Sequence, residues 1–155
     1  MAVSENALKG IMITKKIALG CDHTGPKLKN KIKSELESMG AQILDFGTDG
    51  NESVDYTDYA EKVSQAIING DADMGVLICG SGVGISIAAN RHREIRAANC
   101  INEEMASLAR KHNNANVLAL GARFVDTDTA LKCLKTFFST KFEGGRHERR
   151  VEKMS

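Results

Sequence analysis

The sequence has no excess of charge of either sign. Its 21 lysines and arginines nearly balance 20 aspartates and glutamates, which gives a net charge of +1 over 155 residues. A nucleic-acid-binding domain normally carries a basic surplus, so we expect no nucleic-acid partner and only local basic sites. Long apolar runs are missing too. No stretch approaches the ~20 residues of a membrane-spanning helix, so no membrane association is expected.

Cysteine is sparse, and its spacing disfavours two kinds of site. Cys21, Cys79, Cys100 and Cys133 form no CxxC pair, and no histidine lies at a spacing suited to zinc. We therefore expect no metal and no disulfides, and reduced thiols fit a cytoplasmic protein best. Residues 1–14 contain one lysine, no continuous apolar core and no small-residue cleavage pattern, which predicts a flexible N-terminal extension rather than a targeting signal.

Residues 15–155 are enough for one domain that buries roughly 70% of its extended surface. Short apolar runs alternate here with segments of helical periodicity. This predicts a single doubly wound, Rossmann-like α/β domain of three layers, with a parallel five-stranded sheet and right-handed crossovers. The expected strands are 16–20, 42–46, 74–78, 95–100 and 117–120, and the expected helices are 26–39, 58–69, 85–90, 103–111 and 127–139. The charged C-terminal arm from residue 141 is expected to be solvated.

One stretch, residues 74–90 with the sequence MGVLICGSGVGISIAAN, puts a thiol beside a glycine-rich turn. Cys79 follows the apolar strand, Gly80, Gly82 and Gly84 form the turn, and a helix follows. Glycines let backbone amides approach a ligand closely, and a helix start adds unpaired N–H donors. The stretch predicts a small-anion site beside a functional thiol. A cysteine at a strand end can also be a small buried apolar residue, and that alternative stays open.

Further polar residues are expected at the same edge of the sheet, because doubly wound domains bind ligands at the carboxyl ends of their strands. Asp22 and His23 follow the first strand, and Arg123 follows the last. Asp22 could instead cap the next helix, and His23 could be a solvated loop residue. His112 and Asn113 fall in a helix-to-strand loop, at the opposite edge. If His112 joins the site, it comes from a second subunit, which predicts a homodimer.

Other thiol and phosphate-binding classes fit less well. The glycine spacing does not match GxGxxG, and no GxxxxGK occurs, which disfavours dinucleotide and nucleotide binding. A thiol phosphatase needs an arginine in the loop after the cysteine, and residues 80–86 contain none. A receiver domain needs an acid in place of Cys79. A redox-sensing thiol is disfavoured because no resolving cysteine lies nearby in the sequence.

Five segments, in order, resemble the type B ribose-5-phosphate isomerases, which belong with the galactose-6-phosphate isomerase subunits. They are GCDHTG at 20–25, DYTDYA at 55–60, ICGSGVGISIAAN at 78–90, KHNNANVLALGAR at 111–123 and EGGRHERRV at 143–151. The resemblance implies a homodimer that interconverts ribose 5-phosphate and ribulose 5-phosphate, in the non-oxidative pentose phosphate pathway, without metal or cofactor. Two alternatives stay open: isomerisation of a hexose 6-phosphate (allose or galactose 6-phosphate), and a non-catalytic sugar-phosphate-binding module.

The resemblance also implies a role for each matching residue. Cys79 is the base that takes the C2 proton, Ser81 relays a proton between O1 and O2, and His112 assists opening of the sugar ring. Another branch of the family has a glutamate base where this chain has Ile85, so Cys79 is the base expected here. The implied substrate-binding residues are the amide nest of Gly80, Ser81, Gly82, Val83 and Gly84, the sugar contacts Asp22 and Asn113, and the phosphate contacts His23, Arg123, Arg146 and Arg150.

Overall fold

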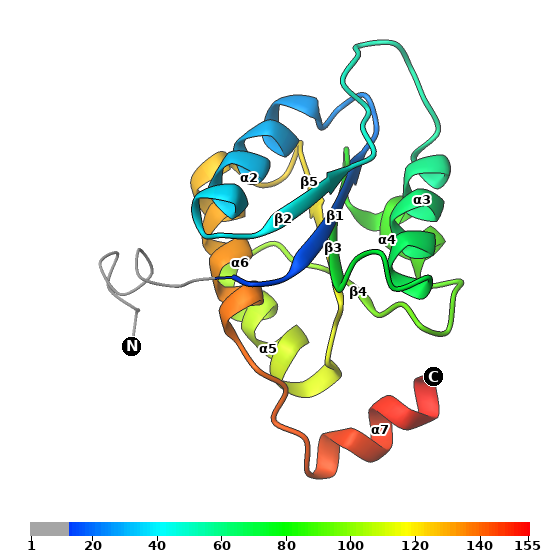
Figure 1. Cartoon of the computed structure of the whole chain (residues 1–155), viewed down its shortest axis with the longest axis vertical. Coiled ribbons are helices and arrows are strands. Elements are labelled where there is room, and N and C mark those ends of the chain that lie inside the picture. The colour runs from blue at the N-terminus through cyan, green and yellow to red at the C-terminus, as the bar shows by residue number, and fades with distance from the viewer. Residues whose placement is uncertain (1–12) are drawn as a thin grey trace.

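Five short apolar runs form an all-parallel sheet in the order β2-β1-β3-β5-β4 in the computed structural model, which describes residues 13–155 (Figure 1). The strands are β1 (Lys16–Cys21), β2 (Gln42–Asp45), β3 (Met74–Cys79), β4 (Ala97–Asn99) and β5 (Val117–Gly121). The central β3 is buried along its whole length. A strand covered on both faces needs apolar residues throughout, which explains the unbroken run MGVLIC.

Helices cover both faces of the sheet and complete three layers (Figure 1). The helices are α2 (Pro26–Ser38), α3 (Tyr56–Ile68), α4 (Val83–Ala89), α5 (Glu103–Asn113), α6 (Thr127–Ser139) and α7 (Arg146–Met154). Leu36 and Phe137 are fully buried between the sheet and the helices α2, α5 and α6, and Val63 and Ile85 are fully buried under α3 and α4. The predicted doubly wound fold is confirmed.

Predicted and observed boundaries differ by only one or two residues for most elements, and two differences concern the site. α4 begins at Val83 rather than at Ile85, because the turn ends at Gly82, whose φ of 78° lies in the left-handed region. α5 continues through His112 and Asn113, which were predicted in a loop. The helix ends one residue later, at Asn114, whose φ of 46° is also left-handed. Asparagine tolerates this conformation better than most residues.

The C-terminal arm is not simply a solvated tail. Residues 146–154 form α7, and His147 and Val151 on this helix are buried. Figure 1 shows α7 beyond the end of α5, at the opposite end of the sheet from the loops that follow β1 and β3. The predicted flexible extension covers residues 1–14, of which 1–12 lie outside the described residues, while Ile13 is buried. None of the helices in the described part has the length and apolar character to span a membrane.

Candidate active site

Cys79 lies at the carboxyl end of β3 and lines a cavity of ≈ 450 Å³. Its Sγ accepts a hydrogen bond from the backbone N–H of Gly82 at 3.1 Å. The side chain is buried in the apolar cluster that includes Val63 and Ile85, and its sulfur is hydrogen-bonded to the glycine turn. The other residues that line this cavity are Asp22, Tyr56, Gly80, Ser81, Val83, Gly84, Arg123 and Phe124.

The glycine turn is held against the end of β5. Cys79 and Gly121 are paired in register, and the N–H of Ala122 donates to the carbonyl of Cys79 at 2.9 Å. A Cβ on Gly121 would lie 2.5 Å from the backbone oxygen of Ser81, so only glycine allows this close approach. The Oγ of Ser81 accepts a hydrogen bond from the N–H of Val83 at 3.1 Å, which closes the turn.

Arg123 is brought over the turn by the same register. Its backbone N–H donates to the carbonyl of Gly80 at 3.0 Å. Its guanidinium atoms lie 3.4–3.5 Å from the point where a Cβ of Gly80 would stand. The cavity therefore combines a cation with the backbone amides of the turn. Such an arrangement suits an anionic ligand.

Asp22 and His23 follow β1 at the same edge. Asp22 is buried, and its Oδ1 accepts hydrogen bonds from the N–H of Thr24 at 2.9 Å and from its hydroxyl at 2.6 Å. Gly25 occupies the N-cap of α2 without a side-chain cap, so the proposed capping role of Asp22 is wrong. Because Oδ1 is engaged by Thr24, Oδ2 is the oxygen available to a ligand in the cavity.

His23 is not among the residues that line the cavity, but its ring has a defined orientation. Its Nδ1 accepts a hydrogen bond from the N–H of Val54 at 3.2 Å. A neutral imidazole that accepts at Nδ1 carries its proton at Nε2. His23 therefore presents an N–H donor on its other side, as a phosphate contact requires. It is not a freely solvated loop residue.

A buried lysine fixes the loop that begins after β2 and reaches Val54. Lys29 is fully buried on α2 and donates to Asp45 at 2.8 Å and to Asp49 at 2.7 Å. Burial alone raises the pKa of Asp45, but hydrogen bonds from Lys29 and from the N–H of Gly47 outweigh it, so this pKa lies below its ordinary value. Sequence reasoning missed Lys29. The burial of Lys29 could have been predicted from its position three residues before Ile32, which puts it on the apolar face of the helix.

The other three cysteines differ from Cys79. Burial raises the pKa of Cys21 and of Cys100 to about 12, and that of Cys133 to about 11. Thiols with such values stay protonated at neutral pH. Cys79 is the cysteine that lines the cavity.

The structure does not bring all the predicted site residues together within one chain. His112 and Asn113 end α5, and Arg146 and Arg150 are exposed on α7. Figure 1 shows α7 and the adjoining end of α5 at the far end of the sheet from the carboxyl end of β3, the strand that ends at Cys79. The predicted placement of His112 at the opposite edge is therefore confirmed, although it lies in a helix.

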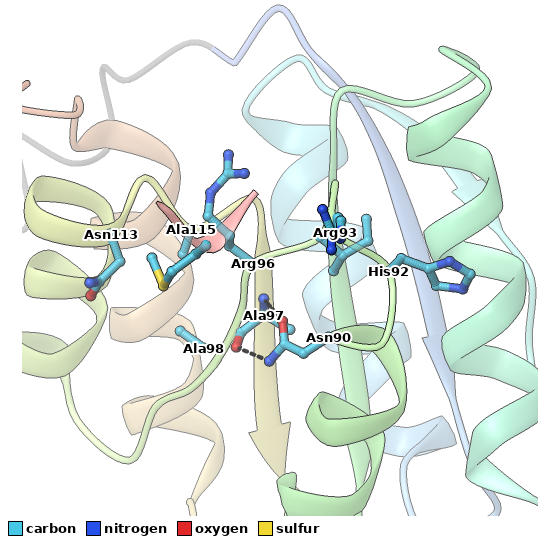
Figure 2. Close-up of a pocket in the computed structure, with 10 residues that line it drawn as sticks. Asn90, His92, Arg93, Arg96, Ala97, Ala98, Asn113 and Ala115 are labelled. Atoms are coloured by element: carbon cyan, nitrogen blue, oxygen red, sulfur yellow. Dashed lines mark hydrogen bonds between the residues drawn. The ribbon is translucent and has the colours of Figure 1, made fainter. Parts of the chain in front are cut away.

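Asn113 lines a different cavity, of ≈ 330 Å³. Figure 2 shows Asn113 on the α5 side of this cavity and two hydrogen bonds between Asn90 and Ala97. His92 points towards α3, where its Nε2 lies 2.7 Å from Glu61. Arg96 donates its Nε–H to the carbonyl of Asn114 at 2.9 Å. Most polar groups of this cavity are thus engaged by the chain itself.

His112, Glu143 and His147 are the three side chains in the described part of the chain that could together hold a metal ion, since their ligand atoms lie within 4.8 Å of one another. However, the two imidazole rings are stacked, with centroids 4.2 Å apart and planes inclined by 15°. Lone pairs of nearly parallel rings do not converge on one point about 2 Å from both nitrogens. The observed geometry therefore does not fit a metal centre.

Comparison with known proteins identifies the family to which this fold belongs. The family model described as Ribose/Galactose Isomerase matches residues 17–154. The chain belongs to the ribose/galactose isomerase family. It is 47% identical over 138 residues to ribose-5-phosphate isomerase B of Escherichia coli K12, a match that covers 89% of this chain and 93% of the relative.

Solved structures of the ribose/galactose isomerase family have the same fold. The ribose-5-phosphate isomerase B of Clostridium thermocellum is 51% identical with a TM-score of 0.88, over 90% of this chain and 94% of that one. The enzyme of Mycoplasma genitalium, solved with bound ribulose 5-phosphate, is 41% identical with a TM-score of 0.86, over 90% of this chain and 93% of that one.

Two aromatic residues of the cavity were not singled out from the sequence. A Cβ on Gly84 would lie 2.7 Å from Cζ of Tyr56, so this ring packs directly over the turn. Phe124 is 73% exposed beside Arg123. Tyr56 lies in the segment DYTDYA, which resembled the family, so its position could have been inferred from that match. Nothing in the sequence indicated that Phe124 lines the cavity, apart from its position after Arg123.

Proposed function

We propose that this chain is an aldose–ketose isomerase that interconverts ribose 5-phosphate and ribulose 5-phosphate through a cis-enediolate. The observation that carries the proposal is the cavity in which the Cys79 sulfur, the glycine turn and Arg123 meet. The 47% identity to the Escherichia coli ribose-5-phosphate isomerase B supports the assignment of the substrate. A chain without nicotinamide or metal can perform this reaction, because oxidation of C2 is balanced by reduction of C1 within one molecule.

We assign the proton transfers to two side chains of the turn. The Cys79 thiolate takes the proton from C2 of the open-chain sugar, and the electron pair of the C–H bond forms the C1–C2 double bond of the enediolate. The thiol then returns this proton to C1. The Ser81 hydroxyl passes the O2 proton to O1. The backbone amides of the turn other than those of Gly82 and Val83, which already donate to Cys79 and Ser81, stabilise the negative oxygen. The loss of one such donor commonly costs ~3 kcal/mol.

Recognition of the substrate uses the remaining groups at this edge. Asp22 offers a carboxylate oxygen to the sugar hydroxyls. Arg123 and the Nε2–H of His23 donate to the phosphate, which positions the reacting carbons at the sulfur. Phosphate binding far from C2 converts binding energy into orientation of the reacting centre.

We propose further that the enzyme is a homodimer whose partner completes each site with His112, Asn113, Arg146 and Arg150. A group of exposed apolar side chains supports a dimer interface, because apolar side chains left in water do not stabilise a monomer. Val83 and Ile87 on α4, Met105 and Leu108 on α5, together with Ile101 and Phe124, are between 41% and 73% exposed. Val83 and Phe124 also line the cavity, so the proposed interface adjoins the reacting sulfur.

The proposed location is the cytoplasm. All four cysteines are free, which is typical of a reducing compartment. The proposed partner of the cavity is one sugar phosphate, and with a net charge of +1 we propose no nucleic-acid or membrane partner.

An isomerase assay tests the substrate. The purified chain should convert ribose 5-phosphate to ribulose 5-phosphate in the presence of a chelator, and should turn over allose 6-phosphate and galactose 6-phosphate more slowly. Faster turnover of a hexose phosphate would replace the pentose assignment. Binding of ribose 5-phosphate without any turnover would favour a non-catalytic sugar-phosphate-binding module instead.

A further inference from the structure

The imidazole of His147 lies face to face with that of His112, with ring centroids 4.2 Å apart and planes 15° from parallel. We propose that His147 is a positioning residue: its stacked ring holds His112 in the orientation needed to open the cyclic sugar. This inference rests on the proposed function. His147 touches neither the thiol nor the glycine turn, so its effect should be confined to steps in which His112 acts.

His147 is well placed to hold another ring still. It is only 6% exposed, because α7 packs against α5 on the side of His147 and Val151. The segment before α7 is tied to the end of α5, since the N–H of Glu143 donates to the carbonyl of Lys111 at 3.1 Å. The two stacked rings thus belong to helices whose ends are joined next to the stack.

Arg110 strengthens the same junction. Its buried guanidinium donates to the carbonyl of Thr140 at 3.1 Å and to Oδ1 of Asn114 at 3.0 Å. Thr140 caps the end of α6 and Asn114 caps the end of α5. The Arg110 guanidinium therefore joins the C-terminal ends of these two helices, beside the histidine pair. A rigid frame matters because a displacement of about 1 Å at a catalytic group can cost roughly 100-fold in rate.

Electrostatics also suit a supporting role. Burial lowers the pKa of His147, and the neighbouring His112, Arg146 and Arg150 lower it further, against the opposing effect of Glu143, whose Oε2 lies 3.7 Å from Nε2. These effects favour the neutral form of His147. A neutral ring adds van der Waals contact to the face of His112 without adding positive charge against it.

The chemistry of the two substrates separates ring opening from proton transfer. Ribose 5-phosphate closes to a furanose through O4 and must be opened before C2 can lose its proton. Ribulose 5-phosphate has a carbonyl at C2 and an esterified O5, so it stays open. Exchange of its C1 proton with solvent needs Cys79 and the turn but no ring opening. A positioning residue of His112 should therefore matter for ribose 5-phosphate and not for this exchange.

The test uses three variants of the full chain. H147A removes the stack, H147F keeps a stacked ring without a titratable group, and V151A shortens the other buried side chain of α7 while the imidazole stays in place. For each variant, kcat and KM are measured for ribose 5-phosphate, and deuterium incorporation at C1 of ribulose 5-phosphate is followed in heavy water. Substrate-free NMR of the His112 ring protons reports the stack itself through its ring-current shift.

We expect H147A to lose roughly 10- to 100-fold in kcat on ribose 5-phosphate, as displacement of a catalytic group does, while its exchange rate stays within about threefold of the unmutated chain. H147F should recover most of the loss, and V151A should show neither effect. Equal losses in both assays, a raised KM with unchanged kcat, or an unshifted His112 resonance in H147A would overturn the inference. An unmutated chain that is inactive in both assays would instead overturn the proposed function, while the NMR comparison still tests the stack.

Discussion

The backbone N–H of Gly82 points at the sulfur of Cys79 from 3.1 Å away. Gly82 then turns the chain into α4, since its φ of 78° lies in the left-handed region. The hydrogen bond to sulfur separates Cys79 from an ordinary buried cysteine, because it holds the sulfur beside the turn that lines the cavity. The proposed base and the proposed oxyanion donors therefore share one turn.

Replacement of the thiol tests the base directly. C79A should fold, since alanine fits a buried strand end, but it should lose roughly 100- to 10,000-fold in turnover, the range that general acid–base catalysis contributes. It should also lose exchange of the sugar C2 proton with heavy water, measured by NMR. C100A is the matched control, because Cys100 is equally buried but does not line the cavity. Retained exchange in C79A would remove Cys79 as the base.

Selective alkylation tests independently whether Cys79 is the accessible and functional thiol. A small alkylating reagent should modify Cys79 alone in the folded protein, because Cys21, Cys100 and Cys133 are buried with pKa values raised to about 11 or 12 and do not line the cavity. Intact mass spectrometry should show one adduct whose formation parallels the loss of activity. Ribose 5-phosphate should slow the modification. An adduct on another cysteine that accompanies inactivation would contradict this assignment.

The buried lysine gives a prediction for stability. K29M leaves the partly buried Asp45 without its main partner and should reduce the free energy of unfolding by about 3 kcal/mol, the lower end of the range for broken buried ion pairs, because Asp49 is exposed. K33M is the control. Lys33 is 38% exposed and lies 3.5 Å from Asp45, so its loss should cost at most about 1 kcal/mol. Urea unfolding measures both variants.

The ion pairs of Lys29 also predict the pH range in which they stabilise the fold. The pKa of Asp45 is lowered in the folded chain, so its contribution is present above the unfolded value of about 4 and is lost as pH falls through the lower, folded pKa. Burial lowers the pKa of Lys29, but its hydrogen bonds to Asp45 and Asp49 raise it overall. Its contribution is therefore lost only as pH rises beyond about 10. The stability difference between K29M and the unmutated chain should be largest between these limits. A difference that grows in acid would refute this account.

Local patterns in the sequence were sufficient to predict the thiol and its turn. An unbroken apolar strand, one cysteine and three glycines are contiguous, so their arrangement depends on backbone geometry within one short segment. Lys29 escaped prediction because its carboxylate partners lie 16 and 20 residues away and only the fold brings them near. A lysine on an apolar helix face is ordinarily a long side chain that reaches solvent.

The contact between His112 and His147 could not be predicted from the sequence for a similar reason. Residues 146–154 are strongly charged, and Val151 and Met154 are their only apolar residues. Helix α7 is stabilised by its contact with α5, where His147 and Val151, four positions apart, share the buried face. A solvated tail was thus a reasonable prediction from composition, although it is wrong for these two residues. The separation of the predicted site residues between the two ends of the sheet was predictable, because helix-to-strand loops and strand-to-helix loops lie at opposite edges.

That division makes a shared dimer site testable by mixing two inactive variants. C79A keeps an intact His112, and H112A keeps an intact Cys79. If His112 acts across the interface, a mixed dimer contains one site in which both residues are intact and one in which both are missing. Unfolding and refolding an equal mixture should make half the dimers mixed, so about a quarter of the unmutated activity should return.

The matched control is a mixture of C79A with the double variant C79A/H112A, which has no intact thiol in any combination and should stay inactive. I87D, which puts a charge on the exposed apolar face of α4, should prevent the recovery and yield monomers by analytical ultracentrifugation. Refolded C79A and H112A that form mixed dimers but recover no activity would show that His112 acts within its own chain or not at all. Recovery at the expected level would require that the sulfur and the imidazole of one site come from different subunits.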